Sequence, residues 1–289
     1  MALEIQGIPT GNVYTGDSFD ITVHDTNSNS PGFDTVSVSW TYDRNKIYIW
    51  EEFAYHTYIY HVVTLKSGTT SIIANHSNMS ATAVINVINH KITLDAGHGL
   101  FTYGKQTPPD PETGIVTKEW TLNNNVCEYV KEYLNNYNVD IYRVDDVTGK
   151  AYANATNDKP VAMRSSEINA IMPELSISVH HNGLQGVWGT HNGVEVYYHS
   201  TKASRDKALA EALSAGIAQE TGLRDRTAKA YDFHMVRETD ASIPSLLSEG
   251  GSMDSTIDYP VIISESGQRA YARALANFCI DFLHLNPIA

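Results

Sequence analysis

Three segments of this chain end in potential metal ligands, and each follows an apolar run that is typical of a buried strand. They are residues 92–99 with His98, residues 175–182 with His180 and His181, and residues 244–251 with Glu249. In a parallel α/β sheet the carboxyl ends of the strands lie along one edge, and ligands bind in the crevice outside that edge. Two imidazoles and a carboxylate that meet there suggest zinc-dependent hydrolysis.

His98 and His180 are the first two candidate ligands. His98 lies between two glycines, which let the backbone turn sharply at the end of the strand, and His180 ends its strand in the same way. Glu119 is suited to be the third ligand, because it begins the helix predicted after a long loop, where the helix dipole also favours a carboxylate. His181 is an alternative to His180, but adjacent strand residues point to opposite faces, so only one of the two can reach the metal.

Glu249 is then available as a general base. Three protein ligands leave the fourth position of tetrahedral zinc open for water, whose pKa falls to about 7, so a neighbouring carboxylate can take its proton and pass it to a leaving amine. A single histidine is more often packed or exposed without such a role, and a glutamate at a helix start is more often a dipole partner. The joint arrangement favours one Zn²⁺ held by His98, Glu119 and His180, with Glu249 as the base.

Composition and charge limit the class of protein. The chain has 289 residues, 42% of them hydrophobic, and a net charge of −13. Residues 1–90 hold 3 basic and 8 acidic side chains (−5), and residues 91–289 hold 17 and 25 (−8). This balance argues against nucleic acid or an anionic membrane as partner, and no run approaches the roughly 20 apolar residues of a membrane helix. Cys127 and Cys279 fall in helical patterns and are predicted to be buried free thiols.

Residues 1–89 are predicted to form a small all-β sandwich, because apolar and polar residues alternate as they do in half-buried strands. The alternation covers residues 19–23, 36–40 and 81–87, and turn-forming residues lie at 27–32, 66–68 and 75–78. Aromatic residues recur in these strands. They form either a sugar-binding face or, more often, core and cross-strand pairs.

Residues 90–289 are predicted to form an α/β domain with a mixed, mostly parallel sheet flanked by helices. Strand-like apolar runs occupy residues 91–94, 139–143, 175–179, 193–198, 233–236 and 245–248. Helical periodicity occupies residues 119–137, 161–172, 203–221 and 267–284. The loop from Leu100 to Lys118 is long for a compact domain and is therefore expected to border a functional site.

A series of short motifs follows the order of a known family. They are Asp95–Gly99 (Asp-Ala-Gly-His-Gly), Glu119 at a helix start, Arg143–Asp146 (Arg-x-x-Asp), Arg164 followed by Asn169 and Ala170, Ser178–Asn182 (Ser-x-His-x-Asn), Gly193–Tyr198 (Gly-x-Glu-x-Tyr-Tyr) and Pro244–Ser252 (Pro-x-x-Leu-x-Glu-x-Gly). With them, residues 91–284 resemble the zinc-dependent N-acetylmuramoyl-L-alanine amidases, which cleave bacterial peptidoglycan. Ala96 stands where that family has proline and Ser252 where it commonly has phenylalanine, but neither change removes a ligand or the base.

The resemblance implies a phosphorylase/hydrolase-like α/β fold and hydrolysis of the amide between N-acetylmuramic acid and L-alanine. It assigns the zinc ligands to His98, Glu119 and His180 and the catalytic glutamate to Glu249. The expected partner is bacterial cell-wall peptidoglycan, without membrane insertion.

Two further resemblances concern the origin of the enzyme and its first domain. Residues 249–255 are similar to the corresponding segment of phage and prophage lytic enzymes, and residues 1–89 loosely resemble bacterial immunoglobulin-like modules, which would serve for wall binding or as a spacer. The first residues have neither the basic segment nor the apolar stretch of a signal peptide. We therefore expect synthesis in the cytoplasm and action on the wall after release, or secretion if a signal has been removed.

Two other interpretations compete with the amidase. A zinc peptidase or carboxypeptidase would also use this ligand set, and Arg226 or Arg237 is available to hold a substrate carboxylate. A wall-binding or tail-associated structural protein with an inactive catalytic domain is the third. The complete set of three ligands and a base weighs against it.

Overall fold

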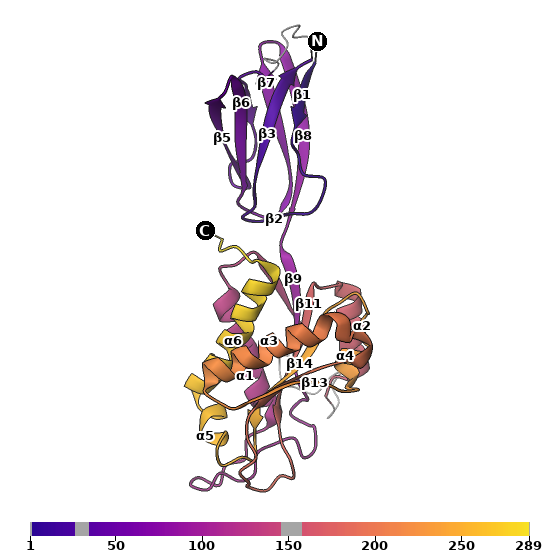
Figure 1. Cartoon of the computed structure of the whole chain (residues 1–289), viewed down its shortest axis with the longest axis vertical. Helices are drawn as coiled ribbons and strands as arrows, with labels where there is room; N and C mark the ends of the chain where they lie inside the picture. The colour runs from indigo at the N-terminus through magenta and orange to yellow at the C-terminus, as the bar shows by residue number, and fades with distance from the viewer. Residues whose placement is uncertain (1, 27–34, 146–157, 289) are drawn as a thin grey trace. The chain divides into compact units, whose positions relative to one another are not determined.

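The computed structural model describes residues 2–26, 35–145 and 158–288, which form two compact units (Figure 1). The first unit comprises the chain up to His90 together with residues 136–138 and the segment from Asn286, and the second comprises the rest. The predicted turn at 27–32 and Asp146 of the Arg-x-x-Asp motif lie outside the described residues.

The described strands of the first unit form two four-stranded sheets, ordered β1-β3-β6-β5 and β2-β8-β7-β4. Their bounds are β1 Leu3–Gln6, β2 Val13–Tyr14, β3 Ser18–Asp25, β4 Ser39–Thr41, β5 Ile47–Ala54, β6 Thr57–Thr64, β7 Gly68–His76 and β8 Met79–Ile88. Alternate residues are buried in one hydrophobic cluster, which includes Ile21 and Val62 from one sheet and Ile72 and Ile85 from the other. The alternation predicted for this part of the chain therefore corresponds to inward-facing core residues.

Two details of the first unit differ from the sequence prediction. Val36 and Val38 pack against the core without belonging to a strand, and only the end of that run forms β4. Strands β5 and β6 were not predicted. They are joined at Tyr55 and His56, which have φ angles of 50° and 67°. Such a tight turn is usually signalled by glycine or asparagine, and neither is present here.

The second unit contains a six-stranded sheet ordered β10-β9-β11-β14-β12-β13. The strands are β9 His90–Ala96, β10 Val139–Arg143, β11 Leu175–Asn182, β12 Val194–Tyr198, β13 Asp225–Ala230 and β14 Ser245–Ser252. Strand β11 is parallel to β9 and to β14, whereas β12 is antiparallel to β14. The predicted mixed, mostly parallel sheet is confirmed.

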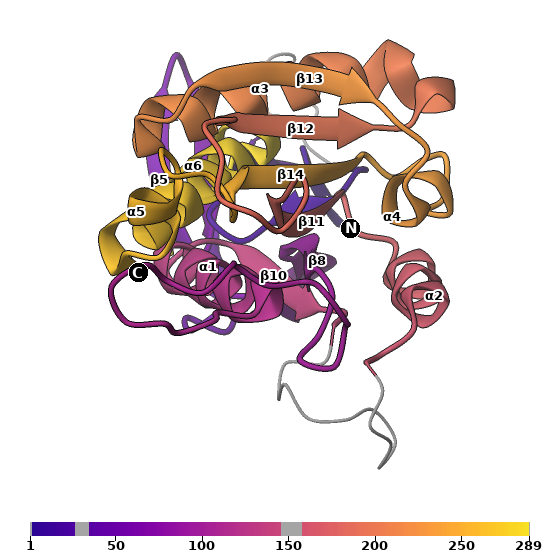
Figure 2. The same ribbon diagram turned by 90° about the horizontal axis from the view of Figure 1, so that it is seen from below.

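The side chains of β11 and β14 are almost all buried, because helices cover both faces of this sheet. The helices are α1 Glu119–Leu134, α2 Val161–Ile171, α3 Ala203–Thr221, α4 His234–Arg237, α5 Tyr259–Ile262 and α6 Glu265–Leu283, with the short 3-10 helix η2 Ser200–Lys202. Helix α6 packs on α1 and on α3, while α2 and α4 pack together, apart from α1 and α6 (Figure 2). The four long helices predicted from the sequence are confirmed.

The strand predicted at residues 233–236 is wrong. The chain forms helix α4 there, and the burial of Met235 and Val236 explains the apolar signal. The sixth strand is instead β13, which lies at the end of the sheet and has no apolar run. Because an edge strand with half-exposed side chains needs no hydrophobic pattern, the sequence did not reveal it.

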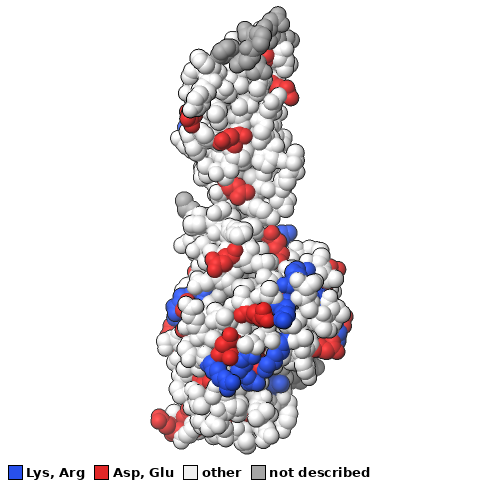
Figure 3. All heavy atoms as spheres, in the orientation of Figure 1, with Lys and Arg blue, Asp and Glu red and all other residues white. Residues whose placement is uncertain are grey.

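The remaining predictions for the whole chain concern cysteines, membrane spans and charge. Cys127 and Cys279 are free and buried, as predicted. None of the helices in the described ranges combines the length and apolar character that a membrane span needs. Figure 3 shows that most of the lysine and arginine side chains on the face drawn lie on the second unit, whereas acidic side chains occur on both.

Candidate metal centre and active site

His98, Glu119 and His180 come together at the carboxyl end of the sheet, and one ligand atom from each lies within 4.8 Å of the other two. The Nε2 atom of His98 is 3.3 Å from one Glu119 oxygen, and Nδ1 of His180 is 3.0 Å from the other. The two imidazole rings are perpendicular, with centroids 4.9 Å apart. Burial lowers the pKa of His98 to about 4. Its ring is therefore neutral near pH 7, which is the form that binds metals.

The backbone that carries His98 is held in a left-handed conformation, with φ at 64°. A non-glycine residue adopts this conformation only when its surroundings enforce it. Arg164 supplies that constraint by donating hydrogen bonds to the carbonyl of His98 at 2.6 Å and to the carbonyl of Ala96 at 3.1 Å. A Cβ atom on Gly97 would lie 2.1 Å from Cε1 of His180, so only glycine fits beside that ring.

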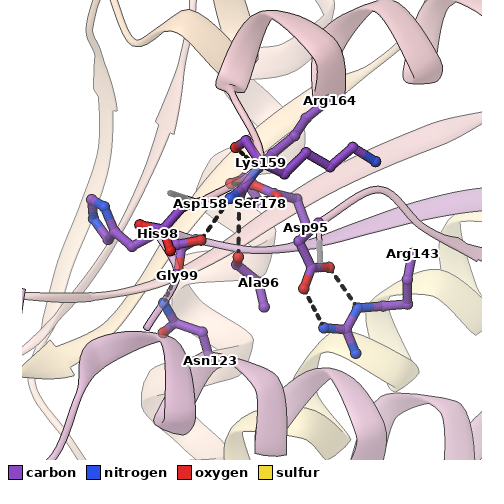
Figure 4. Close-up of polar contacts among 12 residues, drawn as sticks. Asp95, Ala96, His98, Gly99, Asn123, Arg143, Asp158, Lys159, Arg164 and Ser178 are labelled. Carbon is purple, nitrogen blue, oxygen red and sulfur yellow. Dashed lines mark hydrogen bonds and ion pairs between the residues drawn. The ribbon is translucent and has the colours of Figure 1, made fainter. Parts of the chain in front are cut away.

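Asp95 completes this support beneath the ligands. Its carboxylate accepts a hydrogen bond from Arg164 at 2.8 Å and one from the Ser178 hydroxyl at 2.6 Å, and all three side chains are buried (Figure 4). Although burial opposes it, the Arg164 guanidinium holds the pKa of Asp95 below its usual value. A buried charge needs such a partner, so Arg164 and Asp95 position the turn that carries His98.

Glu119 is the first residue of α1 and is almost completely buried. Although burial opposes it, the hydrogen bond from His180 and the charges of the two histidines hold the pKa of Glu119 well below its usual value. Asn123, one turn along the helix, donates to the Gly97 carbonyl at 3.1 Å and lies 3.4 Å from a Glu119 oxygen. Helix α1 and the end of β9 are thereby fixed to each other at the ligands.

His181 points away from the ligand cluster. Its Nδ1 atom lies 2.8 Å from the Asn123 side-chain oxygen, and its ring packs edge-on against Tyr271, with centroids 5.6 Å apart. Burial lowers its pKa to about 4. The alternation of side chains along β11 thus leaves His180, and not His181, beside Glu119.

Glu249 lies on β14 directly beside His180 on β11. Its side chain is 9% exposed, and its Oε2 atom has no hydrogen-bond partner among the described residues. Burial raises the pKa of Glu249 to about 8, although the nearby His180 opposes the rise. A cation held by the three neighbouring ligands would favour the carboxylate form again. Glu249 is therefore a buried titratable group free to exchange a proton.

His98, Glu119, His180 and Glu249 line one cavity of about 700 Å³. Residues 103–109 form part of its wall, and residues 183–186 form another part. The prediction that the loop from Leu100 to Lys118 borders the site is therefore confirmed for residues 103–109.

Two buried acids near the site were not singled out from the sequence. Glu195 is paired with Arg226 at 3.1 Å and with Lys229, and it also accepts a hydrogen bond from Asn182 at 2.7 Å. Glu195 belongs to the Gly-x-Glu motif, which was the available signal. Asp254 accepts the backbone N–H groups of residues 184–186 and contacts His191 at 2.6 Å, so it fixes one wall of the cavity.

Arg143 has a structural role outside the cavity. Its guanidinium forms two hydrogen bonds with Asp145, at 2.8 and 2.7 Å, and others with Glu128 and Asn124 of α1. Arg143 therefore joins β10 to α1.

Comparison with known proteins identifies the family of the chain. The sequence profile of the N-acetylmuramoyl-L-alanine amidase family matches residues 92–280. The N-acetylmuramoyl-L-alanine amidase CwlM of Bacillus licheniformis is 27% identical over 189 residues, which cover 65% of this chain and 66% of that protein. The probable cell wall amidase LytH of Staphylococcus epidermidis is 24% identical over 186 residues, covering 64% and 56%. The chain thus spans less than two thirds of the length of these relatives.

Solved structures share the fold of the second unit. The catalytic domain of the N-acetylmuramoyl-L-alanine amidase CwlV from Bacillus (Paenibacillus) polymyxa var. colistinus superimposes with a TM-score of 0.56 at 22% identity, covering 68% of this chain and 99% of that one. An N-acetylmuramoyl-L-alanine amidase from Clostridium difficile 630 gives a TM-score of 0.56 at 21% identity, with coverage of 68% and 97%. Because the family profile matches well over half of the chain, this protein belongs to the N-acetylmuramoyl-L-alanine amidase family.

Proposed function

We propose that the chain is a zinc-dependent amidase that hydrolyses the bond between N-acetylmuramic acid and L-alanine in bacterial peptidoglycan. The observation that carries the proposal is the convergence of His98, Glu119, His180 and Glu249 on one cavity, on the fold of this family. Family membership supplies the substrate class, and the four side chains supply the chemistry.

The ligand atoms fit zinc in kind, and one pair of them also fits in spacing. Two imidazole nitrogens and one carboxylate oxygen form a set typical of catalytic zinc. Ligand atoms bonded to zinc at about 2.0–2.1 Å lie roughly 3.3 Å apart in a tetrahedron. The distance between His98 Nε2 and Glu119 Oε2 is 3.3 Å. When bound, zinc would polarise the scissile carbonyl and make water more acidic.

Glu249 supplies the proton transfers in this proposal. Its unpaired oxygen accepts a proton from the attacking water and passes it to the nitrogen of the leaving L-alanine as the C–N bond breaks. The products are the free lactyl carboxylate and a peptide with a new amino terminus. Arg164 and Asp95 act through His98, by holding its backbone in place.

The carboxypeptidase interpretation needs an available arginine, and no arginine lies among the described residues that line the cavity. Arg226 is paired with the buried Glu195, and Arg237 is paired on the surface with Glu238 and Asp232. Product analysis separates the two activities, because a carboxypeptidase releases single residues from peptide ends.

The deciding experiment is digestion of purified cell walls by the whole protein with and without a chelator. We expect new amino-terminal alanine and intact glycan strands, loss of activity with the chelator, and recovery on addition of Zn²⁺. Release of single amino acids, or activity that is unaffected by chelation, would contradict the proposal.

We further propose that residues 1–89 form an immunoglobulin-like module that attaches the enzyme to glycan. Two four-stranded sheets that share one core support the module. Tyr48, Trp50 and His61 form a row on the outer face of the β3-β6-β5 sheet, with ring centroids 5.8 and 4.9 Å apart. Asp20 and Glu52 hydrogen-bond to His61, and no lysine or arginine lies on β3, β5 or β6. Aromatic rings with carboxylate acceptors suit uncharged sugars better than anionic polymers.

We also propose a lytic role, as a phage or prophage enzyme made in the cytoplasm that acts on the cell wall after release. The similarity of residues 249–255 to the corresponding segment of such lytic enzymes supports this role. Complementation distinguishes it from a secreted autolysin, because a phage enzyme should lyse its producing cell only when a membrane pore is formed at the same time.

A further inference from the structure

Lys105 is the one lysine or arginine among the described residues that line the cavity of the metal ligands. It lies in the long loop before α1, and its side chain is exposed. No hydrogen bond or ion pair joins its ammonium group to any residue in the described ranges. A cation in this position is therefore free to meet a ligand.

Short antiparallel pairing places Lys105 beside a metal ligand. The backbone N–H of Glu119 donates to the Lys105 carbonyl at 3.0 Å, and the next residues, Gln106 and Lys118, form a β-bridge. The Lys118 ammonium also donates to the Gln106 side chain at 2.8 Å. The backbone of Lys105 is consequently fixed to the start of α1, although its side chain is free.

Lys105 lines the same cavity as His98, Glu119 and Glu249. The other acid on the cavity wall, Asp254, already accepts three backbone N–H groups and contacts His191. Lys105 thus remains the charged group available to a substrate near the scissile bond.

We propose that Lys105 is a specificity-determining residue that recognises a carboxylate on the peptide side of the scissile amide, a role that rests on the proposed amidase function. The leaving group is a peptide that begins with L-alanine. A free carboxylate on the residue after L-alanine would lie within about 7 Å of extended chain from the scissile bond, so it is the nearest acidic group that the peptide can offer. Where that carboxylate is converted to a carboxamide, the charge that Lys105 recognises is absent.

The test uses the whole zinc-loaded protein and two synthetic muramyl tripeptides. In both peptides the second residue is a glutamate joined to the third through its side-chain carboxyl, so that its α-carboxyl is free. The substrates differ only in whether this group is a carboxylate or a carboxamide, and both are blocked at the carboxyl terminus as amides. We expect the wild-type protein to favour the carboxylate by about two- to fivefold in kcat/KM, the range for an ion pair that forms at an exposed side chain. The preference should fall as salt concentration rises.

Two variants and a control decide the outcome. Lys105→Met should reduce the ratio of the two kcat/KM values to about one, while Lys105→Arg should retain a preference for the carboxylate. Lys207→Met removes an exposed positive charge from α3 and should keep the wild-type ratio. Equal cleavage of both substrates by the wild-type protein, or a parallel loss on both in Lys105→Met, would overturn the inference and leave the amidase proposal intact. Cleavage of neither substrate by the wild-type protein would overturn both.

Discussion

The sheets of the two units use polar residues in opposite ways. The difference is clearest between β11 and β14 of the second unit and β3, β5 and β6 of the first. Nearly every side chain of β11 and β14 is buried, so helices cover both faces of that sheet. The strands of the first unit alternate, and their outer face keeps Tyr48 51% exposed and Trp50 42% exposed. One sheet is buried on both sides, and the other has one free side.

The difference determines where each sheet can bind a ligand. Within the doubly covered sheet, a buried charged side chain needs a partner, as Asp95 has in Arg164 and Ser178, and side chains can meet a ligand near the carboxyl ends of the strands. His180 and Glu249 lie at such ends. In the first unit the whole outer face meets solvent, so a row of side chains along a strand can contact a long polymer. The strand ends of the doubly covered sheet suit catalysis at a single position, whereas the exposed face of the first unit suits attachment along a polymer chain.

The largest expected effect comes from removing one ligand at the strand ends. His180→Ala should lose zinc and reduce wall hydrolysis to background, because two ligands do not hold the metal. His181→Ala is the matched control, since its ring lies against Asn123 and Tyr271 on the other side of the strand. Metal analysis of both purified variants checks this. Zinc retained in His180→Ala but lost in His181→Ala would reverse our assignment of the two histidines.

Replacement of Glu249 should separate catalysis from metal binding. Glu249→Gln keeps the size and hydrogen-bonding shape of the side chain but cannot accept the proton. We expect wall hydrolysis to fall by about 10²–10⁴, with zinc content and fold retained. Metal analysis and initial rates on soluble muropeptides measure the two effects. Loss of zinc in this variant would make Glu249 a ligand, and a rate close to that of the wild type would leave the base unidentified.

The next largest effect is expected from replacing Arg164, which holds the turn that carries His98. Arg164→Met leaves Asp95 buried without its cation, which typically costs about 3–5 kcal/mol in the free energy of unfolding. It also frees the His98 carbonyl, so zinc affinity should fall by about 10–100-fold, as for other groups that orient a ligand. Urea unfolding and zinc titration measure these losses.

Arg143→Met provides a matched comparison, because Arg143 also forms a buried pair with an acid, Asp145, but contacts no ligand. It should lose stability while the folded protein keeps its zinc affinity. Equal losses of zinc affinity in Arg164→Met and Arg143→Met would show that general destabilisation, and not the position of His98, is responsible.

Much of the second unit could be predicted from the sequence, because buried strands and amphipathic helices leave strong apolar patterns. The positions of His98, His180 and Glu249 followed from the rule that parallel strands end at one edge. Edge strand β13 could not be predicted, since half-exposed residues such as Arg226 and Lys229 carry no periodic signal. The pairing of Glu195 with both of them depends on strand order, which composition does not encode.

The same limit applies to the first unit and to the loop before α1. The β5–β6 hairpin turns at Tyr55 and His56 without a glycine, so no local signal marks it, and its aromatic row becomes visible only when the strands are paired. Likewise, the loop length predicted a functional role, but the position of Lys105 beside Glu119 depends on a backbone hydrogen bond between residues fourteen positions apart. Long-range pairing of this kind needs the folded chain.

The smallest expected effect concerns the outer face of the first unit. Trp50 stacks on both Tyr48 and His61, so Trp50→Ala removes the centre of the row. Such aromatic contacts are worth about 0.5–1.5 kcal/mol, so binding to intact walls should weaken by about two- to tenfold. The ratio of hydrolysis rates on intact walls and on soluble muropeptides should fall by the same factor. Val84→Ala is the control, because Val84 is exposed on the other sheet and makes no ring contact. Since carboxylates and not cations flank the row, any wall affinity should persist in moderate salt. An unchanged ratio in Trp50→Ala would make the first unit a spacer. The proposed contrast between a catalytic site on the second unit and a wall-binding face on the first would then be wrong.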